Sequence, residues 1–102
     1  MLCFICGEPV QDNGVSVDHV IPWSFIYSDD LWNLVFVHRA CNSRKSNTIP
    51  SEAEIAALKE RNGRLLKLMK LHPVFGRTKL CFELEDALIH DLARRFWIQC
   101  QG

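Results

Sequence analysis

The sequence predicts a small α+β domain in which a metal-binding knuckle and two short strands precede a helical second half. Three observations predict it: two closely spaced pairs of cysteine or histidine, two β-branched segments in the first half, and apolar residues at helical spacing in the second. A chain of 102 residues has room for one core, so we expect a single domain over 1–102. Its 48% apolar content excludes a disordered chain, and no apolar run is long enough to cross a membrane.

Two short strands and a short helix are expected in the first half. Residues 15–21 alternate apolar and polar side chains around Asp18, and Pro22 closes this strand. The stretch 22–32 predicts a loop with large apolar anchors, and 33–37 predicts the second strand. A polar helix is expected from 39 to about 47.

The second half predicts two longer helices. Ser51 and Glu54 form a capping-box signature that begins a helix ending near 71, with a break possible at Gly63. A last helix over about 83–99 carries an apolar stripe at i, i+4 spacing, formed by Leu84, Leu88, Leu92 and Phe96. A basic stripe lies beside the apolar one of the first of these helices and is a candidate phosphate contact; it consists of Arg61, Arg64, Lys67 and Lys70.

The knuckle at residues 3–9 is the first half of a predicted zinc site. Cys3 and Cys6 have the same spacing as His38 and Cys41, and two such pairs can converge on one tetrahedral Zn²⁺. Four protein ligands leave no position for water, so the predicted role of the ion is structural, one per chain. A redox function of Cys3 and Cys6 is the alternative. Five cysteines without a secretory signal favour a cytoplasmic protein over a disulfide framework.

The zero net charge conceals an uneven distribution. Residues 1–37 carry five acidic and no basic side chains (−5), residues 38–79 ten basic and three acidic (+7), and residues 80–102 four acidic and two basic (−2). A basic central block can bind phosphate, although a solvated helix face is the simpler interpretation.

Several motifs in order resemble the HNH endonucleases with a ββα-metal (His-Me finger) fold. They are Cys3-x-x-Cys6-Gly7, Val17-Asp-His-Val-Ile-Pro-Trp-Ser24, Asp30-Leu-Trp-Asn33-Leu-Val and Cys41-Asn-x-x-Lys45-x-Asn47. The resemblance covers 3–47, which would hold the zinc knuckle and the ββα-metal motif, and leaves 51–99 as a helical C-terminal extension. It implies metal-dependent hydrolysis of DNA phosphodiester bonds, giving 5′-phosphate and 3′-hydroxyl ends.

The resemblance also implies the roles of individual residues. His19 would be the general base, oriented by a backbone carbonyl in a loop that Asn33 holds. Asp18 and Asn42 would hold one catalytic Mg²⁺ or Mn²⁺, for which oxygen ligands are suited. Three basic side chains near the short helix would contact DNA; these are Arg39, Arg44 and Lys45.

Two features of the motif need comment. The third letter is Asn42 and not histidine, since His38 mirrors the spacing of the first cysteine pair and is assigned to zinc. In an ideal strand Asp18 and His19 point to opposite faces, so a bend or strand end must bring both to one phosphate.

A non-catalytic, zinc-stabilised nucleic-acid-binding module is the alternative function. A pure binding module has no need of Asp18, His19 and Asn42 together, which favours the enzyme. Apart from DNA, the expected partners are further domains of a longer parent protein or a second copy in a homodimer.

Overall fold

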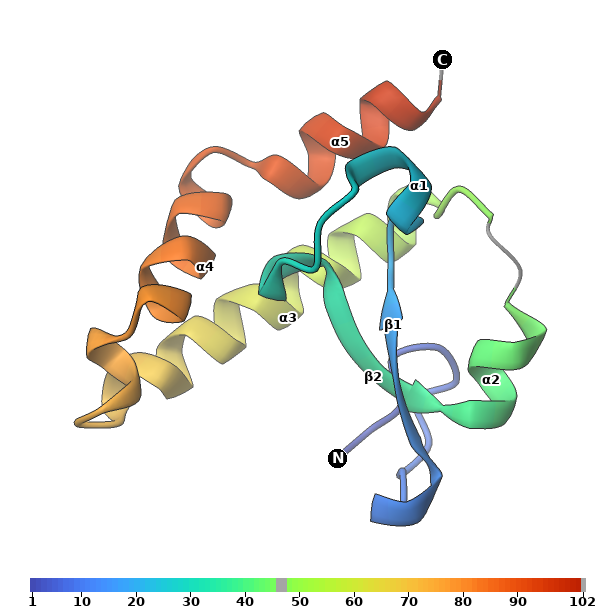
Figure 1. Ribbon diagram of the computed structural model, residues 1–102, viewed down its shortest axis with the longest axis horizontal. Helices are drawn as coiled ribbons and strands as arrows, with labels where there is room; N and C mark the ends of the chain where they lie inside the picture. The colour runs from blue at the N-terminus through green and yellow to red at the C-terminus, as the bar shows by residue number, and fades with distance from the viewer. Residues whose placement is uncertain (46–47, 102) are drawn as a thin grey trace.

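The computed structural model describes residues 1–45 and 48–101 and has a mixed α+β fold (Figure 1). The elements in chain order are η1 (Asp12–Gly14), β1 (Val15–His19), α1 (Trp23–Ile26), η2 (Leu31–Asn33), β2 (Leu34–His38), α2 (Arg39–Arg44), α3 (Glu52–Leu71), η3 (Phe75–Arg77), α4 (Lys79–Ile89) and α5 (Leu92–Cys100). The α+β class with a two-stranded antiparallel sheet is therefore confirmed. In the part of the chain that the structure describes, no helix is both long and apolar enough to span a membrane.

The two strands pair along their full length, from Val15 opposite His38 to His19 opposite Leu34. Val35 and Val37 are buried, whereas Phe36 between them is half exposed, as expected for a strand with one face against a core. Because Asn33 directly precedes β2, it lies at the same end of the sheet as His19. The other end carries His38 and leads into α2.

The knuckle is a tight turn attached to β2. The N–H of Gly7 donates to the carbonyl of Cys3 (2.8 Å), and the N–H of Cys3 donates to the carbonyl of Glu8 (2.8 Å). Gly7 has a φ of +79°, a left-handed conformation that glycine adopts without strain. A bond from Phe4 N to Phe36 O (3.0 Å) joins the turn to the edge of β2. The turn therefore has a fixed position relative to the sheet.

The capping box predicted at the start of α3 is confirmed. The backbone N–H of Glu54 donates to Ser51 Oγ (3.1 Å), and the Glu54 carboxylate reaches back to the N–H of Ser51. The helix is continuous through Gly63, the position of the possible break. The Asn62 side chain beside it is buried and donates to the carbonyl of Trp32 (2.9 Å), which ties this part of α3 to η2.

Three elements differ from the sequence-based expectation. Residues 22–32 contain the short helix α1 and the turn η2, and the strand expected over 15–21 ends at His19. The single helix expected over 83–99 is two helices, so three and not two follow residue 51. Asp91, with a φ of +50°, interrupts the helical backbone between α4 and α5. The expected short helix ends at Arg44, and its predicted continuation to Asn47 lies outside the described residues.

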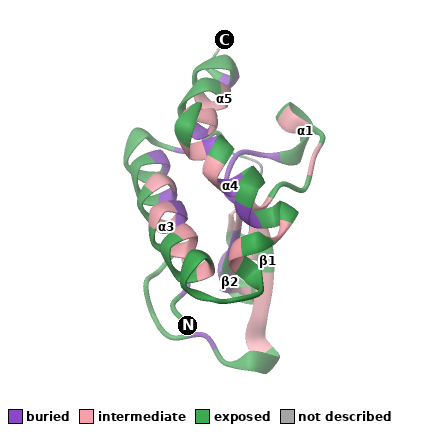
Figure 2. Cartoon of the chain, turned by 90° about the vertical axis from the view of Figure 1, so that its left-hand side faces the viewer, coloured by how far each residue is buried: buried purple, intermediate pink, exposed green. Residues whose placement is uncertain are grey.

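The core lies between the sheet and the three C-terminal helices. Buried positions of the helices face the interior, whereas their outer faces are exposed (Figure 2). Trp32 is a buried anchor and stacks on Phe96 of α5 with 5.7 Å between ring centroids. Trp23 and Phe25, expected as anchors of the same loop, are half exposed. The helical extension thus supports the end of the sheet at which Asn33 and His19 lie.

Candidate metal centre and catalytic site

The four predicted zinc ligands form one cluster. The ligand atoms of Cys3, Cys6, His38 and Cys41 all lie within 4.8 Å of one another. His38 Nδ1 is 3.4 Å from Cys6 Sγ and 3.8 Å from Cys41 Sγ. Zn–S and Zn–N bonds of about 2.3 and 2.1 Å in a tetrahedron give S···N separations of about 3.5 Å. The spacing of the side chains therefore fits a zinc ion.

Neighbouring groups orient the His38 imidazole and lower the pKa of the Cys3 thiol. His38 Nε2 donates to the carbonyl of Pro9 (2.8 Å), which leaves Nδ1 directed at the thiols. Burial would raise the pKa of the Cys3 thiol, but backbone N–H groups of Cys6, His38 and Ile5 lower it, with a net pKa of about 6. A thiol with this pKa is largely deprotonated at neutral pH, as metal coordination requires. The cluster has the donor set of a closed structural site.

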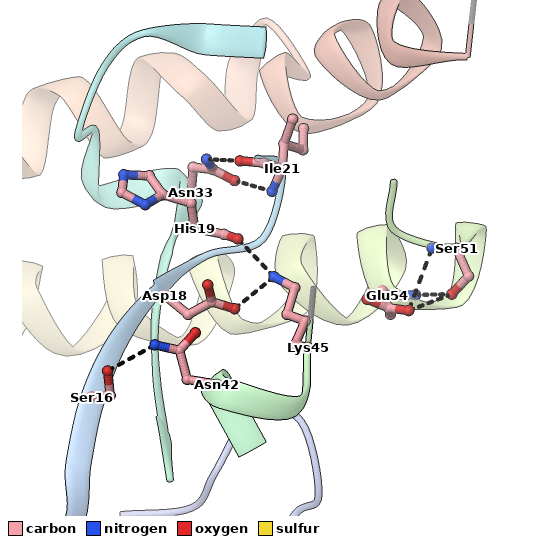
Figure 3. Close-up of polar contacts among 9 residues, drawn as sticks. All are labelled: Ser16, Asp18, His19, Ile21, Asn33, Asn42, Lys45, Ser51 and Glu54. Atoms are coloured by element: carbon pink, nitrogen blue, oxygen red, sulfur yellow. Dashed lines mark hydrogen bonds and ion pairs between the residues drawn. The ribbon is translucent and has the colours of Figure 1, made fainter. Parts of the chain in front are cut away.

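Asp18 and Asn42 lie on neighbouring elements, β1 and α2, and face each other (Figure 3). The Asn42 amide nitrogen donates to Ser16 Oγ (3.0 Å), so the amide oxygen points toward the Asp18 carboxylate. An amide oxygen and a carboxylate are oxygen ligands of the kind that Mg²⁺ and Mn²⁺ prefer. The donor set predicted for the catalytic cation is therefore brought together, and Ser16 orients one half of it.

Lys45 is bonded within this site. Its Nζ donates to Asp18 Oδ2 (2.6 Å) and to the carbonyl of His19 (2.7 Å). The side chains of Lys45 and Asp18 are only 18% and 15% exposed. In this conformation the Lys45 ammonium binds Asp18 and the end of β1. The sequence predicted Lys45 as a contact to DNA. Asn47, the last residue of the same motif, lies outside the described residues.

His19 is the last residue of β1, so the strand end required by the sequence argument is present at this position. Its imidazole and the Asp18 carboxylate leave the strand in different directions (Figure 3). His19 Nε2 donates to Asp29 Oδ1 (2.7 Å), and the Asp29 side chain is 74% exposed. The side-chain partner described for His19 is thus a carboxylate in the loop after α1, in place of the backbone carbonyl expected from the resemblance.

Asn33 holds the segment that follows His19. Its side chain is buried and makes two bonds to Ile21: the Ile21 N–H donates to Oδ1 (2.8 Å), and Nδ2 donates to the Ile21 carbonyl (2.9 Å). The N–H of Val20 also donates to the Asn33 carbonyl (3.0 Å). Asn33 therefore fixes the backbone directly after His19 and makes no described contact with the imidazole itself.

The remaining basic residues differ in how far they are available to a ligand. Arg39 and Arg44 are both exposed on α2, and Arg44 Nη2 also lies 3.6 Å from Cys41 Sγ, beside the cysteine–histidine cluster.

The basic stripe of α3 is partly engaged by the protein. Arg61 donates to the carbonyl of Leu31 (3.1 Å), and its pKa is lowered to about 10 by burial and then by Arg64. Arg64 pairs with Glu60 (2.7 Å), and Lys70 pairs with Glu85. Arg64, Lys67 and Lys70 are nevertheless exposed, so the stripe is partly engaged by the protein and partly open to a ligand.

Two contacts in the site were missed at the sequence level. Ser16 orients Asn42, and Asp29 contacts His19. The only sequence signal for Ser16 is its position two residues before Asp18, on the same face of an ideal strand. No comparable signal marks Asp29, which lies in an irregular loop.

Comparison with known proteins identifies the N-terminal half. Residues 3–51 match the family model described as HNH endonuclease. Searches of curated proteins and of solved structures gave no match. The family supports nuclease-type activity and a nucleic-acid substrate in general terms, and the matched segment contains both the cysteine–histidine cluster and the residues around His19. Residues 3–51 of this chain are therefore similar to the HNH endonucleases.

Proposed function

We propose that the protein is a metal-dependent DNA endonuclease that uses His19 as a general base. The observation that carries the proposal is the pairing of the Asp18 carboxylate with the oriented Asn42 amide, beside His19 at the end of β1. A histidine side chain can act as a general base, as activation of water requires. These groups match the needs of phosphodiester hydrolysis.

In the proposed reaction, His19 takes a proton from a water molecule whose oxygen attacks the phosphorus. The bond from phosphorus to the 3′ oxygen breaks, and this oxygen leaves as a 3′-hydroxyl after it receives a proton from solvent. Asp18 and Asn42 would hold Mg²⁺ or Mn²⁺, and this ion supplies electrostatic stabilisation of the negative charge that develops on the phosphate. Asn33 maintains the position of the backbone after His19.

The proposed structural cofactor is one Zn²⁺ held by the cluster of Cys3, Cys6, His38 and Cys41. This cluster joins the N-terminal turn to the end of β2 and the start of α2. Because α2 carries Asn42, the zinc ion would stabilise the element that supplies one ligand of the catalytic cation. Arg39 is the exposed first residue of α2 and is proposed to contact the DNA backbone. Arg44 and Lys45 are further candidates for this contact.

Plasmid cleavage tests the proposal. Wild-type protein with Mg²⁺ or Mn²⁺ is expected to nick supercoiled DNA, and His19→Ala is expected to lose at least about 100-fold in rate, the contribution of a general base. His90→Ala, which removes an exposed imidazole at the end of α4, serves as the matched control and is expected to retain activity. If the wild type cleaves no DNA with either ion, or if both variants are equally active, the proposed mechanism is wrong.

A further inference from the structure

The contact between Lys45 and Asp18 has the character of a buried counter-ion pair. The ammonium lies 2.6 Å from Asp18 Oδ2 and 2.7 Å from the His19 carbonyl, and both side chains are mostly shielded from water. Two oxygen acceptors therefore surround one positive charge at the end of β1. The same carboxylate faces the amide oxygen of Asn42 (Figure 3).

A divalent cation and this ammonium compete for the same oxygen. Mg²⁺ binds a carboxylate oxygen at about 2.1 Å and demands near-octahedral geometry, so a second cation bonded to that oxygen is both crowded and repelled. Repulsion between the two cations therefore favours departure of the Lys45 ammonium when the ion binds through Asp18 Oδ2. Binding through Oδ1 alone would keep two positive charges on one carboxylate, which is electrostatically unfavourable.

The structure contains a space and a second carboxylate to which Lys45 can move. A hollow of about 230 Å³ lies beside the pair, and its lining includes Asp18, Lys45 and Glu54, with Phe4, Ile5 and Val20. Among residues 1–45 and 48–101, the described contacts of the Glu54 carboxylate are long, at 3.3 Å to Ser51 Oγ and 3.5 Å to Ser51 N. Its carboxylate can therefore accept an ammonium without loss of a short hydrogen bond.

We propose that Lys45 is an exchangeable counter-ion of Asp18, which gives up the carboxylate to the divalent cation and moves across the hollow to Glu54. The inference rests on the cation site of the proposed function. It explains why a cation lies on the Asp18 carboxylate at a position where the family resemblance predicts a metal ion. It also makes Lys45 a determinant of metal affinity before any DNA is bound.

The first test is calorimetric titration of the zinc-loaded chain with MnCl₂ in the absence of DNA. Lys45→Met is expected to bind Mn²⁺ about tenfold more tightly than wild type, because no ion pair of this strength must be broken. Lys59→Met is the matched control, since it removes a lysine from another ion pair, with Asp91 (3.1 Å), and is expected to bind like the wild type. Unchanged or weaker binding by Lys45→Met overturns the proposal.

A second neutral variant keeps the test valid if Lys45→Met does not fold. Lys45→Gln removes the charge but keeps an N–H donor for the Asp18 and His19 oxygens, and it is expected to show the same gain in affinity. Circular dichroism before each titration establishes that the variants are folded. A Lys45→Gln variant that is folded and binds Mn²⁺ no better than wild type also overturns the proposal.

A double-mutant cycle tests whether the Lys45 ammonium moves to Glu54. Glu54→Gln preserves the capping box but removes the charge. It is expected to weaken Mn²⁺ binding several-fold in the wild-type background and to have no effect in Lys45→Met. An equal loss in both backgrounds shows that Glu54 acts on the cation through space and overturns the proposed movement.

The failure of this inference can be distinguished from failure of the proposed function. Asp18→Asn is expected to abolish Mn²⁺ binding if the cation site is correct. Should the wild type and Asp18→Asn behave alike, the cation site itself is wrong. Should the wild type bind through Asp18 while the lysine variants show no gain, only the role of Lys45 is wrong.

Discussion

Replacement of Asn33 by alanine tests the most specific structural prediction for this site. The Asn33 side chain is 1% exposed and satisfies both the N–H and the carbonyl of Ile21, a residue that is itself fully buried. Alanine removes both hydrogen bonds and has no polar side-chain group that could replace them. The backbone after His19 would then hold one unpaired donor and one unpaired acceptor in the core.

The expected magnitude follows from these two groups. Each buried polar group left without a partner costs about 1–3 kcal/mol. Asn33→Ala is therefore expected to lower the free energy of unfolding by about 2–6 kcal/mol. Domains of this size are stable by only about 5–15 kcal/mol, so the variant is expected to lose a large fraction of its stability.

Asn62 provides a matched control within the same core. Its side chain is 2% exposed but makes one described bond, to the carbonyl of Trp32 (2.9 Å), and its Oδ1 has no hydrogen-bond partner among the described residues. Asn62→Ala removes one bond to the Trp32 carbonyl, which also accepts a long bond from Arg61 Nη2 (3.5 Å), and it removes an unpaired oxygen as well. Its expected cost is at most about 1–3 kcal/mol.

The assay is equilibrium unfolding in urea, followed by tryptophan fluorescence and by circular dichroism. The two variants share residue type, burial and change in volume, so the difference between their free energies of unfolding compares the loss of two satisfied backbone groups at Ile21 with the loss of one bond to Trp32. Equal m-values are required for the comparison, because they show that both variants unfold from equally compact states. If Asn33→Ala is no less stable than Asn62→Ala, the argument about the backbone after His19 is refuted.

Three further predictions concern the metals and the base. About one zinc per chain is expected by mass spectrometry, and its removal by a chelator is expected to collapse the dispersed amide NMR signals of β1 and β2; signals that persist without metal contradict a structural site. Ser16→Ala is expected to weaken Mn²⁺ binding about threefold to tenfold, because the Asn42 amide loses the partner that orients it, whereas Ser16→Thr keeps the hydroxyl and is expected to bind like wild type; equal calorimetric affinities for all three proteins count against this role. Asp29→Ala is expected to lower kcat/KM for DNA cleavage at most about fivefold, since exposed ion pairs are worth up to about 1 kcal/mol; a loss as large as that of His19→Ala would make Asp29 essential to the base.

Local patterns predicted much of the site because its chemistry depends on short spacings. The ligand pairs Cys3/Cys6 and His38/Cys41 do form one cluster, and Asn33 does hold the backbone after His19. The capping box at Ser51 is also confirmed, since all of its atoms come from a single turn of helix. Patterns of this kind need little information from the rest of the chain.

The sequence-based predictions were wrong where a residue distant in the chain, or the backbone conformation of a single residue, determines the structure. An unbroken i, i+4 stripe predicts one helix, but the left-handed conformation of Asp91 separates α4 from α5, and Lys59 of α3 pairs with its carboxylate. Likewise, the regular basic spacing of α3 cannot show that Arg61 turns inward to the carbonyl of Leu31. Periodicity reports which face a residue occupies and does not report its partner.

By itself, the sequence determined the likeness of residues 3–51 to HNH endonucleases, the α+β class, the zinc-type ligand set and the candidate site residues around His19. Only the tertiary structure decided that Ser16 orients Asn42, that Asp29 contacts His19 and that Lys45 lies on Asp18. The physical reason is the distance along the chain between the partners. Spacing in the sequence constrains neighbours within one turn or strand, whereas these contacts join β1 to a loop and to α2. The pairing of charges shows the same dependence on range, because Lys45 and Lys70 meet Asp18 and Glu85 only in the folded chain, whereas Arg64 pairs with Glu60 one helical turn away.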